Sequence, residues 1–429
     1  MDKRIAFLNA RLLDPASGLD APGALLIQGN QIADFGPDLF KDGAPSVDET
    51  VDCGGMCLSA GLIDMRVQLR EPGAEHKETI ESIGDAAIAG GVTTLISLPN
   101  TDPVIDDVSV VEFIARRAQE ANRAKIRCYG SVTRGTRGTE LTEMGLLSEA
   151  GALAFTDGNR AIADALVMRR ALSYAKGFDL MIMQHPEEPA LASEGVMNEG
   201  EIATRLGLAG IPMVAETMMV ERDLRLVELT GGRYHAGHLS TAQAIEAVRG
   251  AKKRGLAVTC DTAPNYFALN ETAVGDYRTF AKVSPPLRGE DDRRAVVEGL
   301  ADGTIDAIAS DHTPHDQDSK RLPFDQAEFG AVGLETLLPL TLELYHNGHL
   351  PLLDALAKVT AAPAALMGLP CGKLQRGAPA DLVLFDPDRP WQIDEQKLRS
   401  KSKNTPYDER PVQGVVMRTI VEGHTAYAA

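Results

Sequence analysis

The sequence contains no run of about 18 apolar residues, which is the length that a transmembrane helix needs. Its first residues, MDKRIAFLNARLLD, alternate like a strand and lack the apolar core of a secretory signal. Low-complexity tracts are also missing, and 44% hydrophobic with 24% charged residues is an ordinary globular composition. These absences argue against a fibre, a disordered chain and a membrane-spanning protein.

Positive charge is scarce, with 43 Lys and Arg against 61 Asp and Glu and a net charge of −18. Such a chain repels phosphate backbones and anionic lipid headgroups, so we expect neither nucleic acid nor a membrane as a partner. The acidic surface also cannot attract an anionic substrate over long range. A substrate with a carboxylate would therefore need a local cation inside its pocket.

Cysteine is rare and shows no pairing pattern. The five cysteines, Cys53, Cys57, Cys128, Cys260 and Cys371, are odd in number and scattered. Cys53 and Cys57 have no matching second pair. This usage argues against a disulfide framework and predicts a reducing, cytoplasmic location.

A chain of 429 residues has room for a barrel of roughly 250 to 350 residues and a small second domain. Short alternating runs fill residues 4–56 and recur near residues 380–387 and 415–428, as in β-hairpins. We therefore expect both termini to build one small β sandwich. The predicted domains are the two halves of this β domain, residues 1–57 and 369–429, and the region between them, residues 58–368.

Eight apolar, strand-like runs alternate with helix-length amphipathic segments in the middle of the chain. The runs cover residues 61–67, 91–98, 125–132, 152–157, 180–185, 234–239, 256–261 and 305–311. This alternation predicts parallel strands with crossover helices, and eight such units fit a closed (β/α)8 barrel of the TIM type. An open doubly wound sheet is the rival, but the Gly-rich phosphate loop typical of its first turn does not follow Val67.

Polar residues stand at or just beyond the ends of these runs: Asp64, Asn100, Asp157, His185, His238, Asp261 and Asp311. The carboxyl ends of barrel strands meet on one face, so these side chains are predicted to converge. Asp157, His185 and His238 suit a zinc ion with one position open for water, and Asp311 suits the general base. Any one of them alone is more often a hydrogen-bonded structural residue, and the spacing by itself does not identify a metal.

The segment GLIDMRVQLREPGAEHKETIESIGDAAIAGGVTTLISLPNTDP, residues 61–103, resembles the first two barrel strands of class I dihydroorotases, which are amidohydrolases. Further motifs follow in family order: FTDGN, HPEEPAL, HLSTAQAIE, KVSPPLR, ASDHTPH and FGAVGLET. The resemblance thus spans nearly the whole chain. It implies reversible, metal-assisted hydrolysis of the cyclic amide of L-dihydroorotate to N-carbamoyl-L-aspartate in pyrimidine biosynthesis.

The resemblance also implies roles for single residues. Metal ligands are matched by Asp157, His185, His238 and Asp311, of which Asp311 is also the base, and substrate contacts are matched by Arg70, Asn100, Ser284 and His315. Arg70 supplies the local cation that an acidic chain needs, because a guanidinium can grip a carboxylate with two hydrogen bonds. That role argues against dihydropyrimidines as substrates, and more weakly against allantoin.

The sequence departs from the family after Asp64, where a His-x-His pair usually supplies two ligands to one of two adjacent metals. Arg66 and Gln68 stand at those positions. A guanidinium cannot become a ligand, and its charge repels a divalent cation a few ångströms away. The second metal site is therefore predicted to be lost. Ser284 also replaces a usual Asn, and the APNY segment ending at Tyr266 lacks histidines that are common there.

Three interpretations remain open. The first is a dihydroorotase with one zinc per chain, held by Asp157, His185 and His238, in which the charge of Arg66 partly replaces the missing cation. Some sugar-phosphate deacetylases of the superfamily are similar in lacking the His-x-His pair and keeping one metal. The second is a non-catalytic chain that assembles with aspartate carbamoyltransferase. The third is an amidohydrolase for another cyclic amide, of the hydantoin, dihydropyrimidine or allantoin type.

Two further expectations concern assembly and motion. A homodimer is common among similar proteins. The polar loop of residues 311–333, which has a Gly-rich end, is expected to order over the substrate and exclude water.

Overall fold

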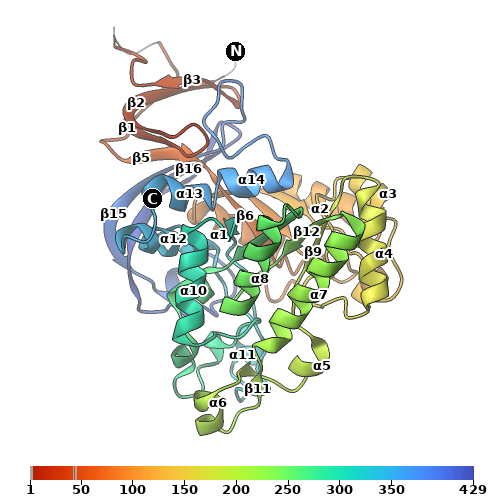
Figure 1. Ribbon diagram of the computed structural model, residues 1–429. Helices are drawn as coiled ribbons and strands as arrows, with labels where there is room; N and C mark the ends of the chain where they lie inside the picture. Colours follow the sequence, from red (N-terminus) through yellow and green to blue (C-terminus); the bar gives the residue numbers. More distant parts are fainter. Residues whose placement is uncertain (1–2, 42, 44–45) are drawn as a thin grey trace.

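Both ends of the chain build one terminal sheet of eight strands. The computed structural model describes residues 3–41, 43 and 46–429. The strands of this sheet are β1 (Arg4–Asp14), β2 (Leu19–Gln28), β3 (Gln31–Gly36), β4 (Glu49–Asp52), β5 (Cys57–Ala60), β15 (Leu382–Gln392), β16 (Pro411–Val421) and β17 (His424–Ala428). Their order is β17-β16-β15-β5-β1-β2-β3, with β4 paired to β1, so β5 joins the N-terminal strands to the C-terminal ones. Figure 1 shows the sheet at one end of the molecule.

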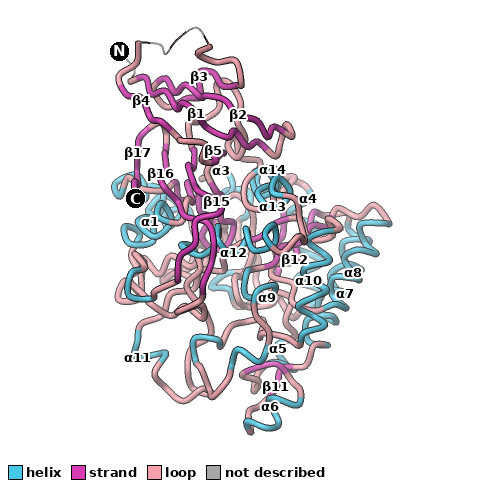
Figure 2. Tube along the Cα trace, turned by 90° about the vertical axis from the view of Figure 1, so that its left-hand side faces the viewer, coloured by secondary structure: helices cyan, strands magenta, loops and turns pink. Residues whose placement is uncertain are grey.

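The terminal sheet has two buried faces because successive strand residues point to opposite sides. In β15, Leu382 and Leu384 pack into the core of the terminal domain, whereas Val383 and Phe385 pack toward the barrel. The two parts are also joined by polar contacts: the Lys125 ammonium lies 2.7 Å from the Asp381 carboxylate. Figure 2 shows β15, β16 and β17 running along the barrel.

The barrel is a closed ring of eight parallel strand segments. Seven are the strands β6 (Leu62–Val67), β7 (Val92–Ser97), β8 (Lys125–Cys128), β9 (Met181–Gln184), β12 (Arg233–Ala236), β13 (Val258–Thr262) and β14 (Ala307–Ile308). The eighth is the segment around Phe155, which bridges Gly130 on one side and Ile182 on the other. A parallel bridge from Val67 to His312 closes the ring. The predicted fold class, including all eight runs, is confirmed.

Helices cover the outside of the ring or lie in the loops at its end (Figure 1). They are α1 (Ile80–Ala89), α2 (Val108–Ala121), α3 (Met144–Glu149), α4 (Ala165–Lys176), α5 (Pro189–Ala192), α6 (Glu201–Leu206), α7 (Val214–Thr230), α8 (Ala242–Lys253), α9 (Pro264–Ala268), α10 (Glu290–Ala301), α11 (Gln317–Lys320), α12 (Leu337–His346), α13 (Leu352–Ala357) and α14 (Ala361–Met367). A short pair, β10 (Met197–Asn198) and β11 (Gly210–Ile211), lies outside the ring. Helix α8 is typical: Thr241 caps its first turn, and Ile245 and Val248 are buried.

The inside of the barrel is filled by side chains rather than open. Met65, Ile96, Tyr129 and Met183 belong to one buried cluster there, and the Tyr129 hydroxyl donates to the Met65 carbonyl at 2.7 Å. The strand bodies thus form a rigid support, and only their carboxyl ends are available for chemistry.

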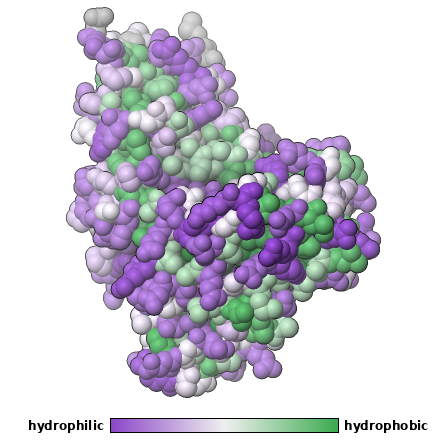
Figure 3. All heavy atoms as spheres, viewed as in Figure 1, coloured by the Kyte–Doolittle hydropathy of each residue, from purple (hydrophilic) through white to green (hydrophobic). Residues whose placement is uncertain are grey.

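Two predictions from the sequence, a domain boundary and the lack of a membrane-spanning helix, can be compared with the fold. The domain boundary predicted between residues 57 and 58 falls inside β5, which pairs with β1 and β15. Within the described part of the chain, no helix has the length and apolar character needed to cross a bilayer. On the face seen in Figure 3, hydrophobic residues are scattered among hydrophilic ones.

Candidate active site

The seam of the barrel is held by Asp64, which lies within β6. Its carboxylate accepts hydrogen bonds from the backbone N–H groups of Arg66 and Ser310, both at 3.1 Å, and from the Ser310 hydroxyl. Burial raises the pKa of Asp64 to about 6, although these bonds favour the ionised form. Asp64 therefore joins the first strand to the end of the last one.

Arg66 occupies the inside of the ring beside this seam, and only 1% of it is exposed. Its Nε lies 3.3 Å from Asp311 Oδ1, and its Nη2 donates to Asn159 Oδ1 at 2.9 Å. A Cβ atom added to Gly237 would lie 3.2 Å from Arg66 Nη1, so the glycine leaves room for the guanidinium. A buried guanidinium needs such partners, because an unpaired charge in the interior is costly.

His238 connects Asp311 to two further buried groups. Its Nε2 lies 3.1 Å from Asp311 Oδ1, and its Nδ1 lies 3.0 Å from Asp261 Oδ1. The other oxygen of Asp261 is 3.4 Å from His235 Nε2. Burial opposes charge on His238, but the two carboxylates raise its pKa above the ordinary value. Burial likewise opposes charge on Asp311 and Asp261, yet His238 holds the pKa of each carboxyl below its usual range.

Asp157 faces Thr133 rather than the histidines. One of its oxygens accepts the Thr133 backbone N–H at 2.9 Å, and the other accepts the Thr133 hydroxyl. Burial raises the pKa of Asp157 to about 6. The Asn100 amide donates to the Asp157 carbonyl at 3.3 Å, while its Oδ1 is buried without a hydrogen-bond partner in the described chain.

His185 lies next to Ser284, with 3.1 Å between its Nε2 and the serine Oγ. Its Nδ1 is buried and has no hydrogen-bond partner among the described residues. Burial, helped by the charge of Arg66, lowers the pKa of His185 to about 3, so the ring is neutral. Glu187 Oε2 is 3.9 Å from the same ring, and burial raises the pKa of Glu187 to about 7.

Arg70 and His315 form a second group on the same face. Arg70 adopts a positive φ of 69°, donates from Nε to the Pro314 carbonyl at 3.0 Å, and places Nη2 3.1 Å from His315 Nε2. Burial lowers the pKa of Arg70 to about 10, which leaves it charged at neutral pH. Gln68 takes no part in this group, since its amide donates to the Thr313 hydroxyl at 3.3 Å.

The segment that follows His315 is fastened by a buried lysine. Lys320 is 2% exposed, and its ammonium donates to the carbonyls of Thr279 at 3.0 Å and Glu328 at 2.6 Å. Burial lowers the pKa of Lys320 to about 7. The predicted ordering of this loop over a substrate stays a prediction, but the loop has an internal anchor.

Comparisons with family models and with known relatives identify the family of this chain. The Dihydro-orotase-like family model matches residues 55–244, and the Amidohydrolase family model matches residues 331–427. A protein named Dihydroorotase from Anaplasma phagocytophilum is 48% identical over 99% of this chain and 95% of its own length. Another, from Syntrophotalea carbinolica, is 46% identical over 99% of both chains. The chain belongs to the dihydroorotase family.

Solved structures agree on the fold. The L-hydantoinase (dihydropyrimidinase) from Arthrobacter aurescens superposes with a TM-score of 0.87 over 99% of this chain and 96% of its own, at 24% identity. A D-hydantoinase from a Thermus species superposes with a TM-score of 0.81 at 22% identity, over 99% of this chain and 96% of its own. The dihydroorotase-family chain is thus an amidohydrolase barrel with a terminal β domain, and it is a hydrolase of cyclic amides.

The dihydroorotase family is generally metal-dependent, with zinc as the usual metal. The predicted ligands do not fit a metal ion as they are arranged here. Asp157 uses both oxygens on Thr133, and the Arg66 guanidinium already pairs with Asp311. Over the described ranges, no three His, Cys, Asp or Glu side chains form a group that could hold an ion. Of the four predicted ligands, the contacts bring together only His238 and Asp311.

Several residues of this site were not anticipated. Thr133 orients Asp157, and Asn159 orients Arg66. Asn159 ends the FTDGN motif, whereas nothing in the local sequence distinguishes Thr133 from an ordinary loop residue. Lys77 lies 3.2 Å from His315 Nδ1. The only available signal for Lys77 was its place in AEHKET, seven residues after Arg70 in the chain.

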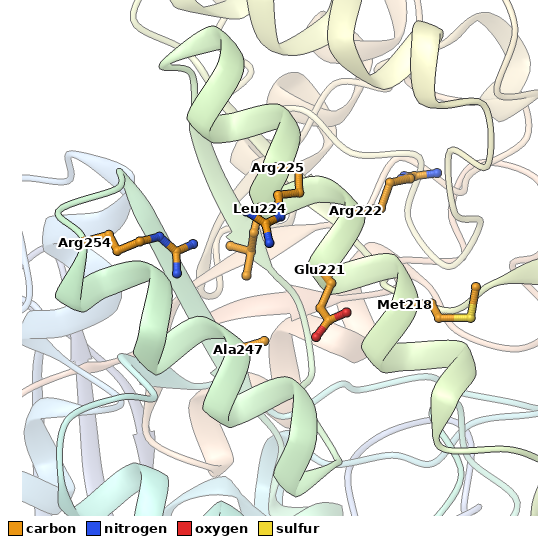
Figure 4. A pocket seen from close by; sticks show the side chains of 7 residues that line it. All are labelled: Met218, Glu221, Arg222, Leu224, Arg225, Ala247 and Arg254. Atoms are coloured by element: carbon orange, nitrogen blue, oxygen red, sulfur yellow. The ribbon is translucent and has the colours of Figure 1, made fainter.

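The dihydroorotase-family chain also has a hollow on the outside of the barrel, between α7 and α8 (Figure 4). Its lining residues are Met218, Glu221, Arg222, Leu224, Arg225, Ala247 and Arg254. None of them stands at a strand end. Arg222 is already bonded to Asp223 at 2.7 Å and to the Ile162 carbonyl at 2.8 Å. The hollow is therefore separate from the candidate active site.

Proposed function

We propose that this chain is a dihydroorotase, which interconverts L-dihydroorotate and N-carbamoyl-L-aspartate by hydrolysing the ring amide. The observation that carries the substrate is Arg70, a largely enclosed guanidinium that forms no ion pair in the described chain. An unpaired enclosed cation favours an anionic ligand, and dihydroorotate bears one carboxylate. Hydantoins and dihydropyrimidines without a carboxylate would leave this charge unpaired.

The residues then divide by role. Arg70 and His315 bind the substrate carboxylate, and the free Oδ1 of Asn100 accepts a ring N–H. At the other end Asp311 takes a proton from the attacking water, whose oxygen bonds to the amide carbon. As the carbon–nitrogen bond breaks, that proton passes to the leaving nitrogen. Arg66 places positive charge beside these steps, where negative charge develops on the carbonyl oxygen.

The proximity of Arg66 has a cost for the base. With His238 and Arg66 holding the pKa of Asp311 below its ordinary value, the carboxylate is ionised at neutral pH but is a weaker proton acceptor. Arg66 thus makes Asp311 a weaker base, and it also stabilises the negative charge that develops on the carbonyl oxygen. Ser284 supports His185 and does not contact the base.

The single zinc inferred from the sequence is a separate hypothesis. Asp157 would have to exchange Thr133 for the ion before it could serve with His185 and His238. No step above depends on that exchange. Elemental analysis of protein purified without chelators, paired with dihydroorotate hydrolysis before and after chelation, tests both matters. About one zinc per chain with chelator-sensitive turnover supports the zinc hypothesis, and turnover without metal supports the centre built on Arg66.

A second candidate function rests on the replacement of the His-x-His pair by Arg66 and Gln68. It is assembly with aspartate carbamoyltransferase in addition to hydrolysis. Co-purification with that enzyme would support it, and separate elution of the two proteins would overturn it. A homodimer and a cytoplasmic location complete the proposal; the location is supported by five cysteines that are all buried and free. Sedimentation measures the first, and cell fractionation the second.

A further inference from the structure

Four cations surround the carboxylate-binding part of the site, and none forms an ion pair within the described residues, although the charge of Glu328 acts to raise the pKa of each. They are Arg70, Lys77, Lys282 and Lys320, and their hydrogen bonds within the described residues go to backbone carbonyls or to His315. Lys282 and Lys320 are both 2% exposed and hold the loop through carbonyls such as Phe324 O at 2.8 Å. Only Arg70 and Lys77 reach His315. In an acidic protein, such a concentration of unpaired positive charge needs a ligand or a structural purpose.

The purpose of Lys77 follows from hydrogen-bond chemistry at His315. The Lys77 Nζ lies 3.2 Å from His315 Nδ1. An ammonium can only donate, so Nδ1 must be the unprotonated, accepting nitrogen. The ring proton of neutral His315 is therefore on Nε2, which lies 2.9 Å from the Phe329 carbonyl and donates to it. Lys77 thus selects one of the two neutral tautomers.

The charge around His315 keeps the ring neutral. Burial, followed by the positive charges of Arg70, Lys77 and Lys320, lowers the pKa of His315 to about 2. The groups that face the ring are these three cations and the Phe329 carbonyl, whereas Asn404 Oδ1 accepts the His315 backbone N–H at 3.0 Å. No side-chain carboxylate bonds to the ring in the described part of the chain.

In this tautomer, a hydrogen-bond donor of His315 lies beside a hydrogen-bond donor of Arg70. Arg70 Nη2 lies 3.1 Å from His315 Nε2, and both nitrogens carry hydrogens. Neither can accept from the other, so each hydrogen needs an acceptor beside the contact, and the Phe329 carbonyl already receives that of Nε2. An anionic oxygen placed there would receive the Arg70 hydrogen in a charge-assisted bond and would share the Nε2 hydrogen with the Phe329 carbonyl in a three-centre bond. A ring protonated on Nδ1 instead would accept from Arg70 and offer the ligand nothing.

We propose that Lys77 is a positioning residue of the substrate site, which fixes His315 as the Nε2–H tautomer so that His315 and Arg70 donate together to the substrate carboxylate. The inference rests on the proposed dihydroorotase function for the identity of that carboxylate. The assignment of the tautomer itself rests only on the contacts of His315.

The supporting frame comes from the C-terminal part of the chain. The Ser402 hydroxyl donates to the Lys77 carbonyl at 2.7 Å, and Asn404 accepts from the His315 backbone and donates to the Thr313 carbonyl at 3.0 Å. One short segment, residues 402–404, therefore holds both partners at the backbone. Replacing the Lys77 side chain leaves these backbone bonds in place, so a folded variant is expected.

The experiment combines a spectroscopic and a kinetic measurement on the whole chain. Long-range ¹H–¹⁵N spectra of protein labelled at histidine report the tautomer, and His315→Gln identifies the signal. Wild type should show His315 protonated on Nε2, and Lys77→Met should weaken this preference, because the Phe329 carbonyl alone then favours it against Arg70. The KM for L-dihydroorotate should rise about tenfold in Lys77→Met with kcat within twofold, and Lys77→Arg should restore both. Lys401→Met removes an exposed lysine of the same neighbourhood and should change neither.

The outcomes separate this inference from the proposed function. A wild-type His315 protonated on Nδ1, or a tautomer and KM unchanged in Lys77→Met, overturns the inference even if dihydroorotate is turned over. Absence of turnover in wild type overturns the proposed function instead. In that case, dihydroorotate added to the labelled protein decides the inference: a shift of the His315 signal that Lys77→Met abolishes supports it, and no shift overturns it.

Discussion

The two ends of the candidate site handle charge in opposite ways. At the reaction end, Arg66, His238, Asp261 and Asp311 are buried and form a connected set in which every charge has an opposite partner. At the carboxylate end, Arg70 and its neighbouring lysines have no carboxylate partner in the described chain. The first set is complete by itself, whereas the second becomes complete when an anion binds. The paired charges fix the geometry of the reaction end, and the unpaired positive charges of the carboxylate end create affinity for an anion.

The largest effect is expected at the reaction end, from Asp311→Asn. The amide cannot accept a proton from water, so kcat for dihydroorotate hydrolysis should fall by about 10³, within the range for a positioned general base. Circular dichroism checks that the fold persists. Asp318→Asn, at an exposed position of the neighbouring loop, is the control and should keep full activity. A loss of tenfold or less would remove Asp311 from the role of base.

The stability of the two ends should also differ. Arg66→Met leaves the buried Asp311 carboxylate without this partner, and breaking a buried pair lowers the free energy of unfolding by about 3–5 kcal/mol. Arg70→Met removes a charge that has no opposite partner and loses one hydrogen bond to a carbonyl, so the change should be about 1 kcal/mol or less. Urea unfolding of both variants measures the difference. Equal losses would break the distinction between the two ends.

Substrate affinity should show the reverse order at Arg70. We expect Arg70→Met to raise KM about a hundredfold, because hydrogen bonds to a charged group contribute about 1.5–3 kcal/mol each. Arg70→Lys should recover only part of the affinity, since an ammonium lacks the planar pair of donors. Initial rates over a range of dihydroorotate concentrations separate KM from kcat. An unchanged KM in Arg70→Met would mean that the carboxylate binds elsewhere.

The smallest expected effect is a change in how the free energy of unfolding depends on pH. Lys320 has a pKa of about 7 in the folded protein and an ordinary value of 10.5, so between these pH values the unfolded chain binds more protons than the folded one. Stability therefore rises with pH in this window, by up to about 1.4 kcal/mol per pH unit from this group. Lys320→Met should remove that rise in urea unfolding at pH 7, 8 and 9. Lys397→Met, with a side chain 83% exposed, should follow wild type; a Lys320→Met curve parallel to wild type would contradict the assignment.

Most of the barrel could be predicted from the sequence because its signals are local. Each strand is an apolar run with polar residues at its end, and a parallel ring brings those ends together whatever the loops do. The run at residues 152–157 contributes only bridges at Phe155, yet its pattern was sufficient to place it. The split β domain was predictable for the same reason, because both termini alternate with a period of two.

The contacts inside the site were not predictable, because they join distant parts of the chain. Arg66 contacts Asn159 across 93 residues and Asp311 across 245. Thr133 donates to Asp157 from both its backbone N–H and its hydroxyl, and no spacing of residues in the sequence predicts that contact. Sequence placed the right residues on one face. Which of them touch depends on loop conformations, such as the positive φ of Arg70, His238 and Asp311.

The order of strands in the terminal sheet also has a consequence for synthesis on the ribosome. Strand β5 pairs with β1 on one side and with β15 on the other, and β15 is made only after the whole barrel. At 5–20 residues per second, roughly 15 to 60 seconds pass before β5 acquires that neighbour. During this time the nascent chain presents an unpaired strand edge, which can pair with another chain. Ribosome-bound chains that end before Leu382 should therefore depend on chaperones far more than the finished protein does.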